Sequence, residues 1–283
     1  MRWQGRRQSD NVEDRRGMRV SRGGLVGGGL GTLAIALIVM FMGGDPTPIL
    51  QNAANGPVTT TQEPYVPTPE EEKTREFVST MLATTEDLWA TEFAAMGGQY
   101  QAPRLVLFRE AVETGCGVAD SGVGPFYCPP DEGVFLDMSF FDEMAAKLQA
   151  GGDFAYAYVV AHEVGHHVQN RLGISGQIQE RRQRVGELEA NQLSVRLELQ
   201  ADCLAGIFGN YADEQNMIEP GDFDEGMRAA SAIGDDRLQR NAGGMVIPDS
   251  FTHGTSAQRQ RWLHRGIDTG SFKACDTFAA ADL

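Results

Sequence analysis

The nine residues "AHEVGHHVQ" hold three of the five histidines of this 283-residue chain within six positions, from His162 to His167. In a helix, residues i and i+4 lie on one face, so His162 and His166 present two imidazoles to the same point. Two imidazoles at this spacing suit a zinc ion, and Glu163 beside them is placed to act as general base toward a water molecule. His167 points about a hundred degrees away from His166 and is expected to pack or lie at the surface. The spacing predicts a zinc site, against the alternative that hydrogen bonds alone satisfy these side chains.

A catalytic zinc site usually has three protein ligands, so a third side chain must come from another part of the chain. In the stretch "RLELQADCLAGIF", Glu198 and Asp202 are also four residues apart, and they interrupt an apolar helix that would not tolerate unpartnered carboxylates. We expect Glu198 to bind the metal and Asp202 to accept a hydrogen bond from the distal nitrogen of a ligating histidine, His162. Glu187 and Glu189 remain alternative ligands if the helix has another register.

A series of predicted elements positions these residues. Apolar residues at helical spacing predict a core helix that starts near Glu70 and stops at Gly97 and Gly98. Two short strands are predicted at 104–110 and 133–139, and further helices at 140–150, 153–173, 193–215, 222–233 and 255–268. The polar stretch 177–192 is expected to be solvated. Together these elements predict a helix-rich α+β domain with a small antiparallel-type sheet.

The N-terminal quarter of the chain has a different composition. Residues 1–24 are basic, residues 25–42 carry no charge, and residues 43–69 are rich in Pro and Thr. This order predicts a cytoplasmic tail, a single transmembrane helix, a linker and, at 70–283, an extracytoplasmic domain. A cleaved signal peptide is the alternative, but "MFMGGDP" is a poor cleavage site.

The four cysteines then lie in an oxidising compartment, where disulfides persist. Cys116 and Cys128 flank a Gly-rich loop, and we expect them to pair with each other. This leaves Cys203 to pair with Cys275, although four cysteines permit three connectivities. Free buried thiols are the alternative, and the spacing is not that of a zinc ribbon.

Several stretches of the sequence resemble the bacterial neutral zinc metallopeptidase family. They are "MRWQGRRQSDNVEDRRG", "GPFYCP", "GGDFAYAYVVAHEVGHHVQ", "SVRLELQADC", "AIGDDRLQ" and "PDSFTHGTSAQR". The blocks that contain HEVGHH and ELQAD are specific, and no position that the family's metal motif needs is missing. The resemblance implies a zincin-like peptidase anchored in the bacterial cell membrane, with Zn²⁺ as cofactor and Glu198 as its glutamate ligand.

His253 lies in "SFTHGTSAQRQRW", which is similar to the Thr-His segment that follows the metal helices in membrane-linked zinc endopeptidases. We expect His253 to donate a hydrogen bond to the oxyanion of the tetrahedral intermediate, with Arg259 as a second candidate. The alternative is that His253 caps or packs the C-terminal helix. His264 is expected to be structural.

The predicted function is hydrolysis of peptide bonds, in which Glu163 transfers a proton from water to the leaving amine. Two alternatives stay open: a catalytically silent, zinc-stabilised scaffold in the cell envelope, and a zinc amidase that acts on a non-peptide cell-wall amide. The net charge of −15 argues against a nucleic-acid partner, because an acidic surface repels phosphates. The predicted partners are therefore a peptide or protein substrate and the membrane.

Overall fold

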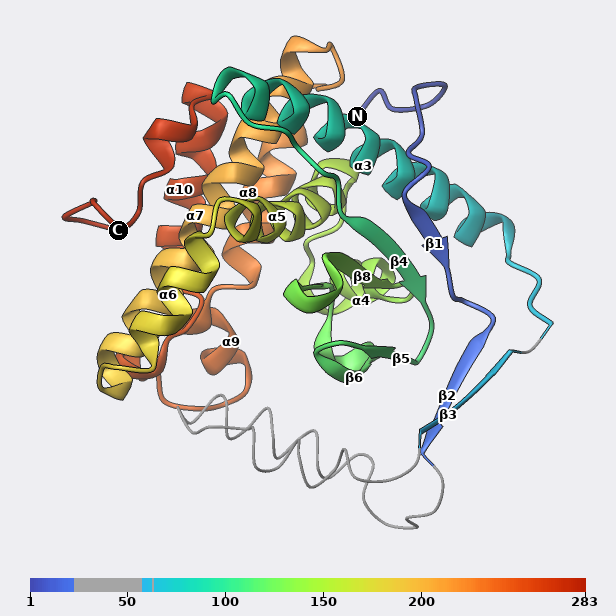
Figure 1. Ribbon diagram of the computed structural model, residues 1–283, viewed down its shortest axis with the longest axis horizontal. Coiled ribbons are helices and arrows are strands. Elements are labelled where there is room, and N and C mark those ends of the chain that lie inside the picture. Colours follow the sequence, from blue (N-terminus) through green and yellow to red (C-terminus); the bar gives the residue numbers. More distant parts are fainter. Residues whose placement is uncertain (23–57, 63) are drawn as a thin grey trace.

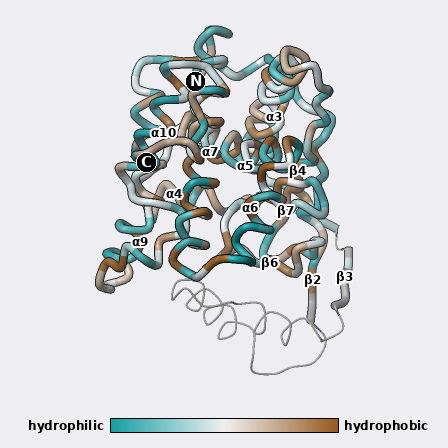
Figure 2. Tube along the Cα trace, turned by 60° about the vertical axis from the view of Figure 1, so that its left-hand side comes forward, coloured by the Kyte–Doolittle hydropathy of each residue, from teal (hydrophilic) through white to brown (hydrophobic). Residues whose placement is uncertain are grey.

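Two long helices lie at the centre of the protein in the computed structural model, which describes residues 1–22, 58–62 and 64–283. Helix α5 lies between α7 and the strands of the largest sheet in both views (Figures 1 and 2). Both helices are largely buried, and they pack directly against each other. Within the described residues, the helices of eight or more residues are α3 (Pro69–Ala95), α4 (Phe140–Leu148), α5 (Asp153–Arg171), α6 (Ile174–Arg182), α7 (Glu187–Glu214), α8 (Asp222–Ala232) and α10 (Ser256–Thr269).

Glycines allow the helices around α7 to approach closely. A Cβ atom at Gly165 of α5 would lie 3.2 Å from the carbonyl oxygen of Ala201 in α7, tighter than ordinary contact. On the other side of α7, Gly206 faces Gly266 of α10, and a Cβ atom at either position would collide with the opposing backbone. Because Gly165, inside the HEVGHH motif, has no Cβ atom, α5 and α7 can approach closely where the predicted ligands lie.

The main sheet has four strands in the order β1-β4-β8-β7. Strands β1 and β4 are parallel, β4 and β8 are parallel, and β7 is antiparallel to β8. The sheet is therefore mixed, and the predicted antiparallel-type sheet is wrong in two of the three pairings. The bounds are β1 (Val12–Asp14), β4 (Arg104–Phe108), β7 (Phe126–Cys128) and β8 (Gly133–Asp137).

Two smaller sheets and one short helix complete the fold. Strand β2 (Met18–Arg22) pairs antiparallel with β3 (Val58–Gln62), and β5 (Ala111–Thr114) pairs antiparallel with β6 (Gly117–Asp120). Helix α9 (Asp235–Asn241) precedes the loop that leads into α10. The hairpin of β5 and β6 occupies the chain between the parallel strands β4 and β8.

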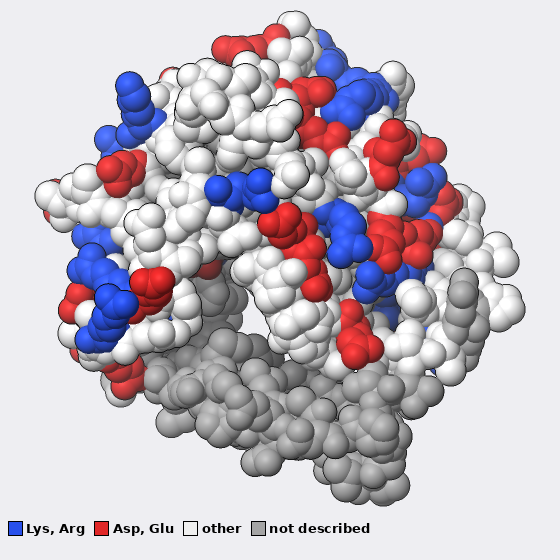
Figure 3. Space-filling view, viewed as in Figure 1, with Lys and Arg blue, Asp and Glu red and all other residues white. Residues whose placement is uncertain are grey.

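The N-terminal residues belong to the domain, which corrects the prediction that residues 1–24 form a separate basic tail. Trp3 is buried, and its Nε1 donates to Asp153 at the start of α5 at 3.0 Å. Arg16 is buried between Asp14 and Glu72, its Nη2 lying 2.6 and 2.7 Å from their carboxylates. Acidic and basic side chains are interspersed around α3 and β1 (Figure 3). The arginines of this segment that form ion pairs within the domain include Arg2, Arg7, Arg15 and Arg16.

The prediction of a single-pass membrane anchor is wrong for a topological reason. Strand β1 lies before the predicted transmembrane helix 25–42 and β4 lies after it, yet the two pair in one sheet. A single crossing would put them on opposite sides of the membrane. Residues 25–42 and the first part of the predicted linker lie outside the described residues. None of the described helices is both long enough and apolar enough to span a membrane.

The two predicted disulfides are present. Cys116 is bonded to Cys128, which joins the start of β6 to the end of β7. Cys203 of α7 is bonded to Cys275 in the C-terminal segment. The second bond fastens the end of the chain against the helix that carries Glu198 and Asp202.

Candidate metal centre

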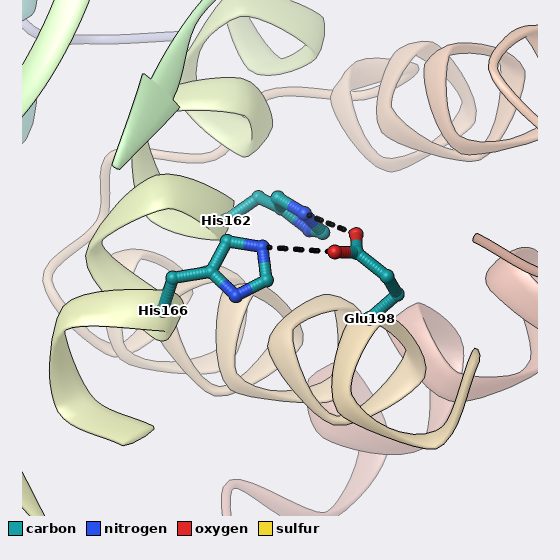
Figure 4. A group of neighbouring side chains, drawn as sticks. All are labelled: His162, His166 and Glu198. Carbon is teal, nitrogen blue, oxygen red and sulfur yellow. Dashed lines mark ion pairs between the residues drawn. The ribbon is translucent and has the colours of Figure 1, made fainter. Parts of the chain in front are cut away.

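Two histidines of α5 and one glutamate of α7 meet at a single point (Figure 4). The distance between His162 Nε2 and Glu198 Oε2 is 3.3 Å, and that between His166 Nε2 and Glu198 Oε1 is 3.4 Å. A tetrahedral zinc ion with bonds of about 2.0–2.1 Å holds neighbouring ligand atoms about 3.4 Å apart. The three side chains therefore fit zinc in both chemical type and spacing.

The pKa shifts of His162 and Glu198 indicate that this cluster favours a bound cation. Burial alone would lower the pKa of His162, but hydrogen bonds to Asp202 and Glu198 raise it to about 10. Burial would raise the pKa of Glu198, yet the neighbouring imidazoles hold it well below its usual range. A buried carboxylate between two imidazoles is thus stable when positive charge accompanies it, as protons or as a metal ion.

The imidazole of His162 is oriented by a buried charged network. Its Nδ1 lies 2.9 Å from Asp202 Oδ1, so Nδ1 carries the proton and Nε2 is left to face Glu198. Arg259 donates to both oxygens of the Asp202 carboxylate, at 2.8 and 2.9 Å. The hydroxyl of Tyr158 donates to Asp202 Oδ1 at 2.6 Å. Asp202 therefore has a full set of partners in the protein interior.

Arg259 binds Asp202 in this network, whereas the sequence led us to expect it at the substrate oxyanion. Arg259 is buried and bound to Asp202, so it does not reach toward a substrate oxyanion, and that prediction is wrong. Tyr158 was not identified from the sequence. It lies four residues before His162 on α5, and this spacing is the signal that would have placed it on the same face.

The imidazole of His166 is oriented by neutral amides. Its Nδ1 lies 2.9 Å from Gln169 Oε1. The Gln169 amide nitrogen donates to the carbonyl of Leu197 and to the side-chain oxygen of Gln200, which leaves Oε1 as the acceptor for His166. Gln200 donates in turn to the carbonyl of Cys275. Sequence reasoning missed Gln169 and Gln200, although Gln169 lies three residues after His166, within reach on a helix.

Glu163 follows His162 on α5, and its carboxyl lies near the imidazoles of His162 and His166. It is buried, and burial raises the pKa of its carboxyl. The positive imidazoles of His162 and His166 oppose this rise, and so does the nearby backbone N–H of Tyr127 in β7. A carboxylate with a raised pKa beside a metal site suits a general base.

His253 lies in the loop before α10, with a half-exposed side chain. Its Nδ1 is 3.1 Å from Asp235 Oδ1, and Asp235 Oδ2 accepts the backbone N–H groups of three consecutive residues, Thr252, His253 and Gly254. Desolvation lowers the pKa of His253, but the bond to Asp235 and the charge of Glu198 raise it overall. Asp235, which the sequence did not single out, therefore fixes His253 within electrostatic range of the cluster.

The other candidates lie away from this point. Glu189 precedes Glu198 by nine residues on α7 and pairs with Arg181 at 2.9 Å. Glu187 is the first residue of α7. His264 pairs with Asp268 on the exposed side of α10 at 2.8 Å. Among the residues that the structure describes, the cluster that could hold a metal ion is therefore His162, His166 and Glu198.

Comparisons with known proteins agree with this chemistry. The family described as "Putative neutral zinc metallopeptidase" matches residues 1–278. The uncharacterized protein YpfJ of Escherichia coli K12 is 48% identical over 289 residues, which cover 98% of this chain and 99% of YpfJ. The uncharacterized proteins Mb2605 of Mycobacterium bovis and Rv2575 of Mycobacterium tuberculosis are each 45% identical over 195 residues, 65% of either chain. No solved structure gives a significant match.

Proposed function

Because the chain belongs to the neutral zinc metallopeptidase family, whose cofactor is zinc, we propose that it hydrolyses peptide bonds with a zinc ion held by His162, His166 and Glu198. The observation that carries this proposal is the buried carboxylate of Glu163 beside a three-residue site. A zinc site that only stabilised a scaffold would have no use for this carboxylate, which is costly to bury.

The side chains around the site have separate roles in the proposed reaction. When held by His162, His166 and Glu198, a zinc ion would supply Lewis acidity for the attack of water on the scissile carbonyl. Glu163 takes a proton from the water as the water oxygen bonds to the carbonyl carbon, and delivers it to the amide nitrogen as the C–N bond breaks. His253 donates a hydrogen bond to the carbonyl oxygen as that oxygen gains negative charge.

The raised pKa of Glu163 supports its role. Burial stabilises the protonated carboxyl, so the group accepts a proton from water more readily than an exposed carboxylate would. The raised pKa of His253 supports its role in the same way, because a protonated imidazole is the stronger donor to an oxyanion.

The test is the Glu163→Gln variant, which keeps the size of the side chain and removes the base. We expect cleavage of a mixed peptide library, followed by mass spectrometry, to fall about 10²–10⁴-fold, with zinc content unchanged. Glu189→Gln is the matched control, because it makes the same change on an exposed residue of α7 and also tests the alternative ligand.

The three outcomes separate the candidate functions. Products from the parent and the Glu189→Gln variant, but not from Glu163→Gln, would support the peptidase. Equal activity of Glu163→Gln and the parent would remove the mechanism. If the zinc-loaded parent cleaves no peptide, the same pair of variants can be assayed on cell-wall amides, and inactivity there would leave the scaffold.

A further inference from the structure

Helix α5 carries two polar stripes that face different neighbours. Residues at i, i+4 and i+7 lie along one side of a helix, and the HEVGHH motif and the two polar residues after it supply two such sets one residue apart. The stripe that faces α7 is His162, His166 and Gln169. The stripe that faces β7 is Glu163, His167 and Asn170.

The second stripe binds one residue of β7, Tyr127. His167 is fully buried, and its Nε2 lies 2.7 Å from the carbonyl oxygen of Gln101, so Nε2 carries a proton. The Asn170 amide nitrogen can only donate to the Tyr127 hydroxyl, so the proton of that hydroxyl is left for His167 Nδ1. The hydroxyl of Tyr127, 3.0 Å away, therefore donates to Nδ1 and accepts from the Asn170 amide at 3.0 Å.

The backbone of the same residue lies beside the general base. The N–H of Tyr127 is close enough to the Glu163 carboxylate to favour its ionised form, one helical turn before His167. Strand β7 has three residues and lies at the edge of the sheet, so β8 alone pairs with it along one side. A strand this short needs other contacts to hold its position.

We propose that His167 is a positioning residue: by binding the Tyr127 hydroxyl it holds β7 so that the Tyr127 backbone N–H meets and orients the Glu163 carboxylate. The inference rests on the proposed function in one respect, the role of Glu163 as base. It gives the third histidine of the motif a task other than binding metal.

Tyr127→Phe is the test variant, because it removes one hydroxyl and leaves the ring packing in place. The chain offers a matched control in Tyr100, whose ring also contacts His167 edge-on but whose buried hydroxyl has no hydrogen-bond partner among the described residues. Tyr100→Phe therefore removes the same atom near the same imidazole without breaking the link. A third variant, His167→Gln, keeps one donor and one acceptor.

The first readout is amide hydrogen exchange at residues 126–128 of the zinc-loaded full chain, measured by NMR. Loss of a hydrogen bond of ordinary strength predicts about ten-fold faster exchange in Tyr127→Phe and no change in Tyr100→Phe. Unchanged exchange in Tyr127→Phe would overturn the link between His167 and β7. This readout does not depend on activity, so it decides the link even if the parent cleaves no peptide.

The second readout is steady-state kinetics of the same variants. Misplacement of the base predicts about ten-fold lower kcat for Tyr127→Phe, with KM and zinc affinity within two-fold of the parent. His167→Gln should recover most of the kcat that His167→Leu loses. Equal kcat in Tyr127→Phe and Tyr100→Phe would overturn the positioning role, whereas an inactive parent would overturn the proposed function instead.

Discussion

His162 and His166 meet the same glutamate, but the protein holds their imidazoles in different ways. Behind His162 lies a charged group, Asp202, which Arg259 neutralises. Behind His166 lies the neutral amide of Gln169. A carboxylate partner raises the basicity of an imidazole more than an amide does, because it stabilises the positive charge.

We call Asp202 with Arg259 the charged support of His162, and Gln169 with Gln200 the neutral support of His166. The two supports affect different properties of the imidazoles that they hold. The charged support makes His162 the stronger electron donor to a metal. It also buries the ion pair of Asp202 and Arg259, so the loss of either residue would leave an unpaired charge in the interior. The neutral support connects His166 through Gln200 to the backbone at Cys275, beside the disulfide to Cys203. The charged support therefore sets the basicity of the His162 imidazole, and the neutral support fixes the position of the His166 imidazole.

The largest expected effect concerns pH. In the metal-free protein the pKa of His162 is about 10, so His162 carries a proton at neutral pH that zinc must displace. Zinc affinity should therefore rise with pH, by about ten-fold per unit from His162 alone, and more steeply below the raised pKa of His166, which also loses a proton. Glu198 adds nothing near neutral pH, because its lowered pKa keeps it ionised. Competition with a chelator at three pH values measures the slope, and a flat profile would contradict the charged support.

The second-largest effect is expected from Asp202→Asn, which removes the negative charge behind His162 and leaves the amide behind His166 in place. It leaves the Arg259 guanidinium buried without an anion, which should lower the free energy of unfolding by about 3–5 kcal/mol. Zinc affinity should fall about 10- to 100-fold, and its rise with pH should become shallower. Denaturant unfolding and the same chelator titration check both values.

A double variant is the control for this prediction. Asp202→Asn with Arg259→Met removes both charges, so the stability should largely return while the zinc affinity stays low. Recovery of both quantities would show that Asp202 acts on folding alone and not on the imidazole of His162.

The smallest expected effect comes from Gln169→Leu. It removes the acceptor for His166 Nδ1 but buries no unpaired charge, so zinc affinity should fall about ten-fold and stability by about 1–2 kcal/mol. The pH slope should stay as in the parent, because His162 keeps its carboxylate. Gln177→Leu, on the exposed side of α6, is the control and should change neither quantity. A larger loss of zinc affinity in Gln169→Leu than in Asp202→Asn would contradict the view that the charged partner of His162 matters more than the neutral partner of His166.

The candidate site was largely predictable because its geometry is local. The spacing of His162 and His166, and that of Glu198 and Asp202, depends only on helical periodicity. The partners Arg259 and Gln200 were not predictable in these roles, because their contacts depend on how α7 meets α10 and the C-terminal segment. Distances of 57 and 75 residues along the chain separate the bonded pairs Arg259–Asp202 and Gln200–Cys275.

The fold was predictable where apolar periodicity is strong. The helix predicted at 153–173 is α5, with an end two residues earlier. The polar stretch 177–192 contains α6 and the start of α7, which were missed because Ile178 is the only buried residue that α6 offers as a periodic signal. Strand β1 was missed because "VED" has no strand pattern, and its pairing with β4 joins Val12 to Leu105.

The N-terminal segment also sets an order of assembly during synthesis. Trp3 can find Asp153 only when α5 has been made, and the backbone bond from Arg2 to Met217 must wait for the end of α7. At about 5–20 residues per second, the ribosome needs on the order of ten seconds or more to supply these partners. These N-terminal residues are therefore translated early but reach their native contacts late, and a nascent chain released early would leave Trp3 without its partner Asp153.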